Sequence, residues 1–216
     1  MIDIRTSKIG QEFTIEELKQ QCKMICGGVC WPGKRPGFAV VLGMSHDKHF
    51  DNHDIYLLDE FENMDMWELI KQCGVLIQKY QPTMWIGDRK NDAADRFIRE
   101  LNATFKRPEM PYLKQLYLSV CWTPILDMKN PYPYIMSEIK KLVDKKRRQL
   151  VLKDSKTKNY LGDIEPSDVA DLQLGDYPAI EAMAFAVIEL RRHGQQSSVP
   201  EWLRRRKEPP LSPMSF

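Results

Sequence analysis

The sequence predicts a single α/β domain followed by a short tail. Of its 216 residues, 43% are hydrophobic, which is enough for one sizeable core and little for two. Short apolar runs bounded by turn residues alternate with longer segments of helical period, in the order strand–strand–strand–helix–strand–helix–strand–helices. The domain is expected to span residues 1–193. The basic, proline-rich residues 194–216 are expected to be a disordered tail.

The N-terminal part predicts a short helix and a β-hairpin. Thr14 with Glu17 three residues later forms a capping-box pattern, which favours a helix over residues 14–24. Residues 27–33 then form a short apolar run with a Pro/Gly turn, and residues 37–43 a second, β-branched run. Such runs around a turn are typical of two antiparallel strands.

The middle of the chain predicts a third strand at residues 55–61, followed by a helix. Residues 65–80 carry apolar side chains at close to helical period, and Pro82 ends that helix. Residues 45–54 contain three of the four histidines and several aspartates. Such a segment could bind zinc or nickel, but an exposed hairpin turn is the favoured interpretation because it lies between two strands.

The rest of the chain alternates helices and strands. Residues 83–88 form a short apolar strand that ends in Gly-Asp, and an acid at such a strand end is a site candidate. Asp88 could also cap the next helix, and the two roles are compatible. The later elements are a helix at 91–101, a strand at 116–122, a basic helix ending at Arg148, a strand at 149–152, a polar loop at 155–174 and an apolar helix from Pro178.

Charge is balanced overall but unevenly distributed. The formal charge is +2, from 32 Lys and Arg against 30 Asp and Glu. Residues 47–68 carry eight acids, whereas residues 140–158 carry nine Lys or Arg. A basic face that contacts a polyanion and an ordinary solvated helix face both explain the second run. No apolar run approaches the length of a bilayer span and no export signal is present, so we expect a cytoplasmic protein with no membrane partner.

Two further patterns are weaker. Cys22, Cys26 and Cys30 are evenly spaced, but no second distant pair completes a structural zinc site, so reduced thiols are expected. Residues 28–35 match Gly-x4-Gly-Lys, yet Arg35 replaces the metal-binding Ser or Thr and a strand follows instead of a helix. We therefore expect no ATPase motor in this chain.

The order of motifs resembles the ribonuclease H-like nuclease domain of phage large terminase subunits. The family's first-strand Gly-x-Asp-x-Gly pattern is similar to residues 28–33 with one extra residue, and Gly87-Asp88 is similar to the acid after the fourth strand. The segment 176–183, Asp-Tyr-Pro-Ala-Ile-Glu-Ala-Met, resembles the start of the family's last helix. The resemblance covers about residues 24–192 and implies a mixed sheet, three antiparallel strands then parallel strands, flanked by helices.

The resemblance implies a metal-dependent DNA endonuclease. Two divalent ions, Mg²⁺ or Mn²⁺, at about 3.5–4 Å would activate water and stabilise the leaving oxygen. Converging carboxylates repel each other unless cations bind. The implied catalytic residues are Asp88, Asp176 and Glu181, with Glu60 as a further candidate, and the implied metal ligands are Asp88, Asp176 and the residue at position 30.

Position 30 departs from the family because it is a cysteine. A thiol is a soft ligand with a pKa of about 8.5, whereas Mg²⁺ prefers hard oxygen. Three explanations stay open: an inactivating change, a preference for a softer ion such as Mn²⁺ or Zn²⁺, or a core cysteine in a different fold.

The leading hypothesis is a terminase-type endonuclease that cuts DNA during phage genome packaging, with its activity impaired by Cys30. The alternative is an inactive DNA-binding or packaging adaptor of the same fold, and a resolvase-like or transposase-like protein is a third hypothesis. The expected partners are double-stranded DNA and a separate packaging ATPase or portal, in the cytoplasm of a phage-infected or prophage-carrying host. The residues expected to contact DNA phosphates are Lys140, Lys141, Lys145, Lys146, Arg147 and Arg148.

Overall fold

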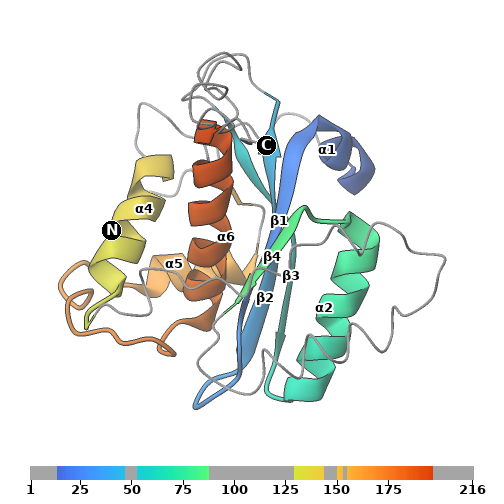
Figure 1. The fold of residues 1–216 in the computed structure, drawn as a ribbon. Helices are drawn as coiled ribbons and strands as arrows, with labels where there is room; N and C mark the ends of the chain where they lie inside the picture. The colour runs from blue at the N-terminus through green and yellow to red at the C-terminus, as the bar shows by residue number, and fades with distance from the viewer. Residues whose placement is uncertain (1–13, 47–52, 88–128, 144–149, 153–154, 197–216) are drawn as a thin grey trace, which may run out of the picture.

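A computed structural model of the chain describes residues 14–46, 53–87, 129–143, 150–152 and 155–196. These residues form a central sheet with helices on both faces (Figure 1). The helices α4 (Tyr132–Val143), α5 (Lys156–Asp163) and α6 (Pro178–Gln196) lie on one side of the sheet, and α1 (Ile15–Gln21) and α2 (Met66–Tyr80) lie on the other.

The sheet has the order β4-β1-β2-β3-β5. Its strands are β1 (Cys22–Cys30), β2 (Gly37–Ser45), β3 (Ile55–Asn63), β4 (Met84–Gly87) and β5 (Leu150–Val151). The pairs β1–β2 and β2–β3 are antiparallel, whereas β4 runs parallel to β1 and β5 parallel to β3. This mixed sheet confirms the predicted fold class. Most of the hairpin turn predicted at residues 45–54 lies outside the described residues.

Each face of the sheet has its own apolar core. On one face, alternate residues of β1 and β2, such as Cys26 and Val40, pack against α4 and α6. On the other face, Val29 and Val41 pack against α2. From Ile25 of β1 and through Met44 of β2, the residues are buried on both faces, and this explains why these strands appear as near-continuous apolar runs.

The helix α6 lies unusually close to β1. A Cβ built on Gly28 would lie 2.0 Å from the backbone oxygen of Ala182 and 3.3 Å from Cβ of Ala186. Only a glycine leaves the space for this approach. The contact therefore fixes the first two turns of α6 against the end of β1.

One helix lies where the sequence predicted only a polar loop. The helix α5 begins after Ser155, whose side chain accepts a hydrogen bond from the backbone N–H of Lys158. The carboxylate of Glu60 on β3 accepts hydrogen bonds from the backbone N–H groups of Lys156 and Thr157, at 2.6 and 3.0 Å. The prediction of a loop here was wrong. The helix is capped in part by Glu60 on a distant strand, and the local sequence does not show this contact.

Several predicted elements lie outside the described residues, namely the helix at 91–101, the strand at 116–122, the end of the basic helix at Arg148 and residues 197–216. The helix α6 includes residues 194–196, so it continues into the stretch that composition assigns to the tail. Within the part of the chain that the structure describes, no helix combines the length and apolar character that crossing a bilayer requires.

The α6–β1 contact predicts a large penalty for a methyl group at position 28. Gly28→Ala should lower the free energy of unfolding by about 3 kcal/mol, because the backbone of Ala182 must move away. Denaturant unfolding followed by circular dichroism measures this change. Gly33→Ala is the matched control, since a Cβ at position 33 would meet nothing within 4 Å. Equal stability of the two variants would contradict the packing described here.

Candidate functional site

The end of β1 and the first turn of α6 meet at one hydrogen bond. Cys30, the last residue of β1, lies with its Sγ 3.2 Å from Oε2 of Glu181. Glu181 belongs to the first turn of α6, which begins at Pro178. Residues 151 positions apart in the chain therefore come together at the C-terminal end of β1.

The other carboxylate oxygen of Glu181 is also engaged. Its Oε1 accepts a hydrogen bond of 2.6 Å from the hydroxyl of Tyr132 and one of 2.7 Å from the backbone N–H of Gly175. The Tyr132 hydroxyl in turn accepts a 2.8 Å hydrogen bond from the backbone N–H of Tyr177. We call Cys30, Tyr132 and Glu181 the buried cluster.

All three side chains of the buried cluster are shielded from solvent. Glu181 is 2% exposed, Cys30 is 7% exposed and Tyr132 is fully buried. Burial raises the pKa of Glu181, and its hydrogen bonds with Tyr132, Gly175 and Cys30 oppose this only partly. Burial, followed by the nearby Glu181 carboxylate, also raises the pKa of Tyr132. Burial therefore disfavours the charged forms of Glu181 and Tyr132.

Asp176 and Glu60 make other contacts. Oδ2 of Asp176 accepts a 2.7 Å hydrogen bond from the backbone N–H of Gln173, which closes the turn before α6. That turn contains Gly175, whose φ of 98° is in the left-handed region that glycine tolerates. Glu60 holds the start of α5, where its Oε2 also accepts a 2.7 Å hydrogen bond from Oγ1 of Thr157.

The remaining predicted site residues are only partly described. Asp88 lies outside the described residues, but it directly follows Gly87, which pairs with Val29 in the parallel β1–β4 register. Lys140 and Lys141 lie on α4 and are exposed, and Lys141 pairs with Glu138. Lys145, Lys146, Arg147 and Arg148 lie outside the described residues. The functional roles predicted for these residues stay predictions.

The described donors fit a pair of hard divalent ions poorly. Mg²⁺ and Mn²⁺ sites need several anionic oxygens, whereas the buried cluster offers one carboxyl group, a phenol and a thiol. The carboxyl group already accepts three hydrogen bonds. Among the described residues, no group of three or more His, Cys, Asp or Glu side chains is arranged to hold a metal ion.

Tyr132 is the member of the cluster that sequence reasoning missed. It belongs to the Pro/Tyr-rich stretch at residues 130–133, which precedes and opens α4. A tyrosine between two prolines can be noticed in the sequence, but the pattern does not indicate that its hydroxyl contacts Glu181. The partner is decided by the packing of α4 against α6 within the same apolar core.

Comparisons with known proteins give structural likenesses at low sequence identity. The nuclease domain of the large terminase (g2p) from bacteriophage SPP1, solved with bound Mn, shares 16% identity at a TM-score of 0.49, over 84% of this chain and 94% of that one. RuvC from Thermus thermophilus shares 10% identity at a TM-score of 0.40, over 79% of this chain and 96% of that one. The same protein in complex with a Holliday junction substrate shares 14% identity at a TM-score of 0.40, over 80% of this chain and 98% of that one. No family model and no curated protein matches the sequence.

The buried carboxyl group predicts a distinct pH dependence of stability. Because the folded-state pKa of Glu181 lies above its unfolded value of about 4.3, the folded chain binds more protons between these two values. The free energy of unfolding should therefore fall as pH rises through this window. Glu181→Gln, which is neutral and of the same shape, should remove this part of the dependence.

Chemical denaturation at a series of pH values from about 4 to about 8 measures the difference between the wild type and Glu181→Gln. Glu68→Gln is the control, because Glu68 is an exposed carboxylate paired with Lys71 on α2. Parallel pH curves for the wild type and Glu181→Gln would show that the buried carboxyl group is not the titrating group.

Proposed function

We propose that the chain is a ribonuclease H-like DNA-binding protein of the terminase type that acts as a packaging adaptor and does not cut DNA. The observation that carries this proposal is the buried cluster. At the position where the family resemblance implies a metal-bridging acid, Cys30 donates a hydrogen bond to Glu181. The carboxyl group that would hold a cation is instead held by Cys30, Tyr132 and Gly175.

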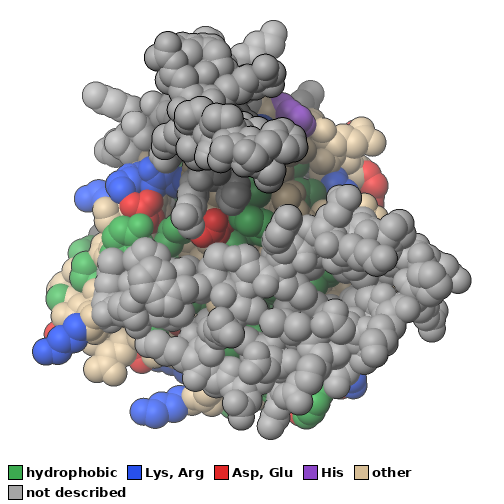
Figure 2. Space-filling view, in the orientation of Figure 1, with side chains coloured by type: hydrophobic (Ala, Val, Ile, Leu, Met, Phe, Trp, Pro, Cys, Tyr) green, Lys and Arg blue, Asp and Glu red, His purple; other side chains and the backbone are tan. Residues whose placement is uncertain are grey.

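The DNA-binding part of the proposal is supported by charge. The run of nine Lys or Arg at residues 140–158 begins on the exposed side of α4. Figure 2 shows one group of Lys and Arg side chains, with Asp or Glu beside it, on the side of the molecule where α4 lies in Figure 1, and further Lys and Arg side chains along the lower rim. Phosphate contacts from such side chains give affinity with weak sequence preference.

A metal-dependent endonuclease is the second candidate function, and one observation favours it. Cys30 and Glu181 occupy positions that match two of the family's acids, and the fold brings them together. Asp88 follows the β4 residue that pairs beside the end of β1. In this candidate, Asp88, Asp176 and Glu181 would hold two Mg²⁺ or Mn²⁺ ions, with Cys30 a poor substitute for the bridging acid and Glu60 a further carboxylate.

Plasmid nicking separates the two candidates. The wild-type chain should leave supercoiled plasmid intact with Mg²⁺ and with Mn²⁺, because the bridging acid is missing. Mn²⁺-dependent nicking that disappears in both Asp88→Asn and Asp176→Asn would overturn the adaptor proposal in favour of the endonuclease. Cys30→Asp then tests whether the site was once catalytic. A strong gain of cleavage indicates a nuclease site that was lost, whereas no gain indicates a scaffold.

DNA binding itself has a quantitative signature. Lys140→Glu should weaken binding to a DNA duplex and reduce the slope of log affinity against log salt concentration by about 1. Changing Lys145, Lys146, Arg147 and Arg148 together should reduce the slope further. Fluorescence anisotropy at several salt concentrations measures both effects. Lys71→Glu is the control on the opposite side of the sheet, and an equal loss there would point to nonspecific charge instead of a basic face.

A further inference from the structure

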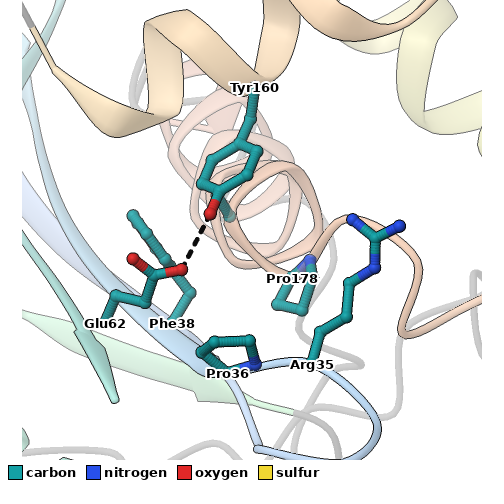
Figure 3. A pocket seen from close by; sticks show the side chains of 7 residues that line it. Arg35, Pro36, Phe38, Glu62, Tyr160 and Pro178 are labelled. Atoms are coloured by element: carbon teal, nitrogen blue, oxygen red, sulfur yellow. Dashed lines mark hydrogen bonds between the residues drawn. The ribbon is translucent and has the colours of Figure 1, made fainter. Parts of the chain in front are cut away.

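A pocket of about 270 Å³ lies beside the buried cluster but is not part of it. Its walls come from five elements of the chain: the β1–β2 turn, the start of β2, the end of β3, α5 and the start of α6. The side chains that matter for its chemistry are Arg35, Pro36, Phe38, Glu62, Tyr160 and Pro178 (Figure 3). We call it the Arg35 pocket.

The Arg35 pocket has a rigid aromatic wall. The ring of Tyr160 packs edge-to-face on Phe38, with ring centroids 6.2 Å apart and an interplanar angle of 88°. The Tyr160 hydroxyl donates a 2.8 Å hydrogen bond to Oε1 of Glu62 (Figure 3). Phe38 is buried, whereas Tyr160 is only partly buried, so Tyr160 offers the accessible ring. Rings held in this way bind flat ligands at a low cost in conformational entropy.

The charges around the pocket favour an anionic ligand. The carboxylate of Glu62 is already paired with Lys156 at 2.6 Å. Arg35 is exposed, and its guanidinium lies 5.2 Å from the ring centroid of Tyr177. Among the described residues, no carboxylate lies within ion-pair distance of Arg35. The lining carries one arginine and one carboxylate, and Lys156 pairs with that carboxylate, so the guanidinium of Arg35 at the rim is the group that can meet an anion.

These features together match one nucleotide unit. A volume of about 270 Å³ is below the ~300 Å³ at which sites for drug-sized ligands begin, so the pocket suits one ring system. One Glu62 oxygen accepts a hydrogen bond from Tyr160 and the other from Lys156, and a carboxylate has about four acceptor positions. The remaining acceptor positions can take the N–H groups of a base, and guanine presents adjacent donors on its Watson–Crick edge.

We infer that the Arg35 pocket binds a single unpaired nucleobase, preferably guanine, with Arg35 contacting the attached phosphate and Tyr160 contacting the base. The inference rests on the proposed DNA-binding function and adds to it a site that binds an unstacked nucleotide. Stacking of bases on aromatic side chains is the general way in which proteins hold single-stranded nucleic acid.

Titration of the full chain with the four deoxynucleoside monophosphates, followed by NMR, tests the inference. Deoxyguanosine monophosphate should bind most tightly. Tyr160→Ala should weaken binding of every nucleotide about fivefold or more, whereas Tyr160→Phe, which keeps the ring, should not. Glu62→Gln should remove the preference for guanine. Arg35→Gln should weaken binding of the monophosphate but not of deoxyguanosine, and Lys71→Gln should change nothing.

Three results would overturn the inference. They are no binding of any mononucleotide, binding that Tyr160→Ala leaves unchanged, and binding of N-acetylarginine amide in place of nucleotides, which would indicate a protein partner at Glu62. Duplex binding measured on the same samples separates this inference from the proposed function. If the chain binds duplex DNA but no mononucleotide, the inference about the pocket is rejected and the proposed adaptor function stands. If it binds mononucleotides but no duplex, the adaptor function is rejected and the inference about the pocket stands.

Discussion

The approach of α6 to β1 at Gly28 is the constraint on which the rest of the structure depends. The backbone oxygen of Ala182 lies where a side chain at position 28 would begin. Because this contact leaves no space between helix and strand, the first turn of α6 must lie beside the end of β1. The juxtaposition of Glu181 with Cys30 follows directly, and so does the position of the Arg35 pocket between α6, α5 and the β1–β2 turn.

The same constraint decides what chemistry the site favours. A carboxyl group placed in an apolar environment must be neutral, paired or bound to cations. Here burial raises the pKa of Glu181, and hydrogen bonds from a thiol, a phenol and a backbone N–H offset this effect only in part. An acid at position 30 would place a second carboxyl group beside Glu181, and the two would have to share a proton or bind cations. The residue type at the end of β1 therefore decides whether Glu181 meets a thiol or a second carboxyl group.

The sequence was sufficient for elements whose signals are local. The hairpin of β1 and β2 has a turn between two apolar runs. The helix α2 has apolar side chains at helical period and Pro82 after its end. The order of motifs predicted Cys30, Asp88 and Asp176 as metal ligands and Glu181 as a further acid. The structure joins Cys30 to Glu181, whereas Asp176 accepts a hydrogen bond from Gln173 and Asp88 lies outside the described residues. Tyr132 and α5 were not found because their partners, Glu181 and Glu60, lie 49 and 96 residues away in the chain. Such contacts are decided by packing, which no local pattern records.

The cap that Glu60 provides also has a consequence for the order in which the chain acquires its structure. The strands β1, β2 and β3 pair in consecutive hairpins, so their contacts are local and can form early during synthesis. The helix α5 is short, and two of its first amide groups have their acceptor only on β3. The start of α5 therefore depends on β3, and this helix acquires its full cap only where β3 has taken its place in the sheet.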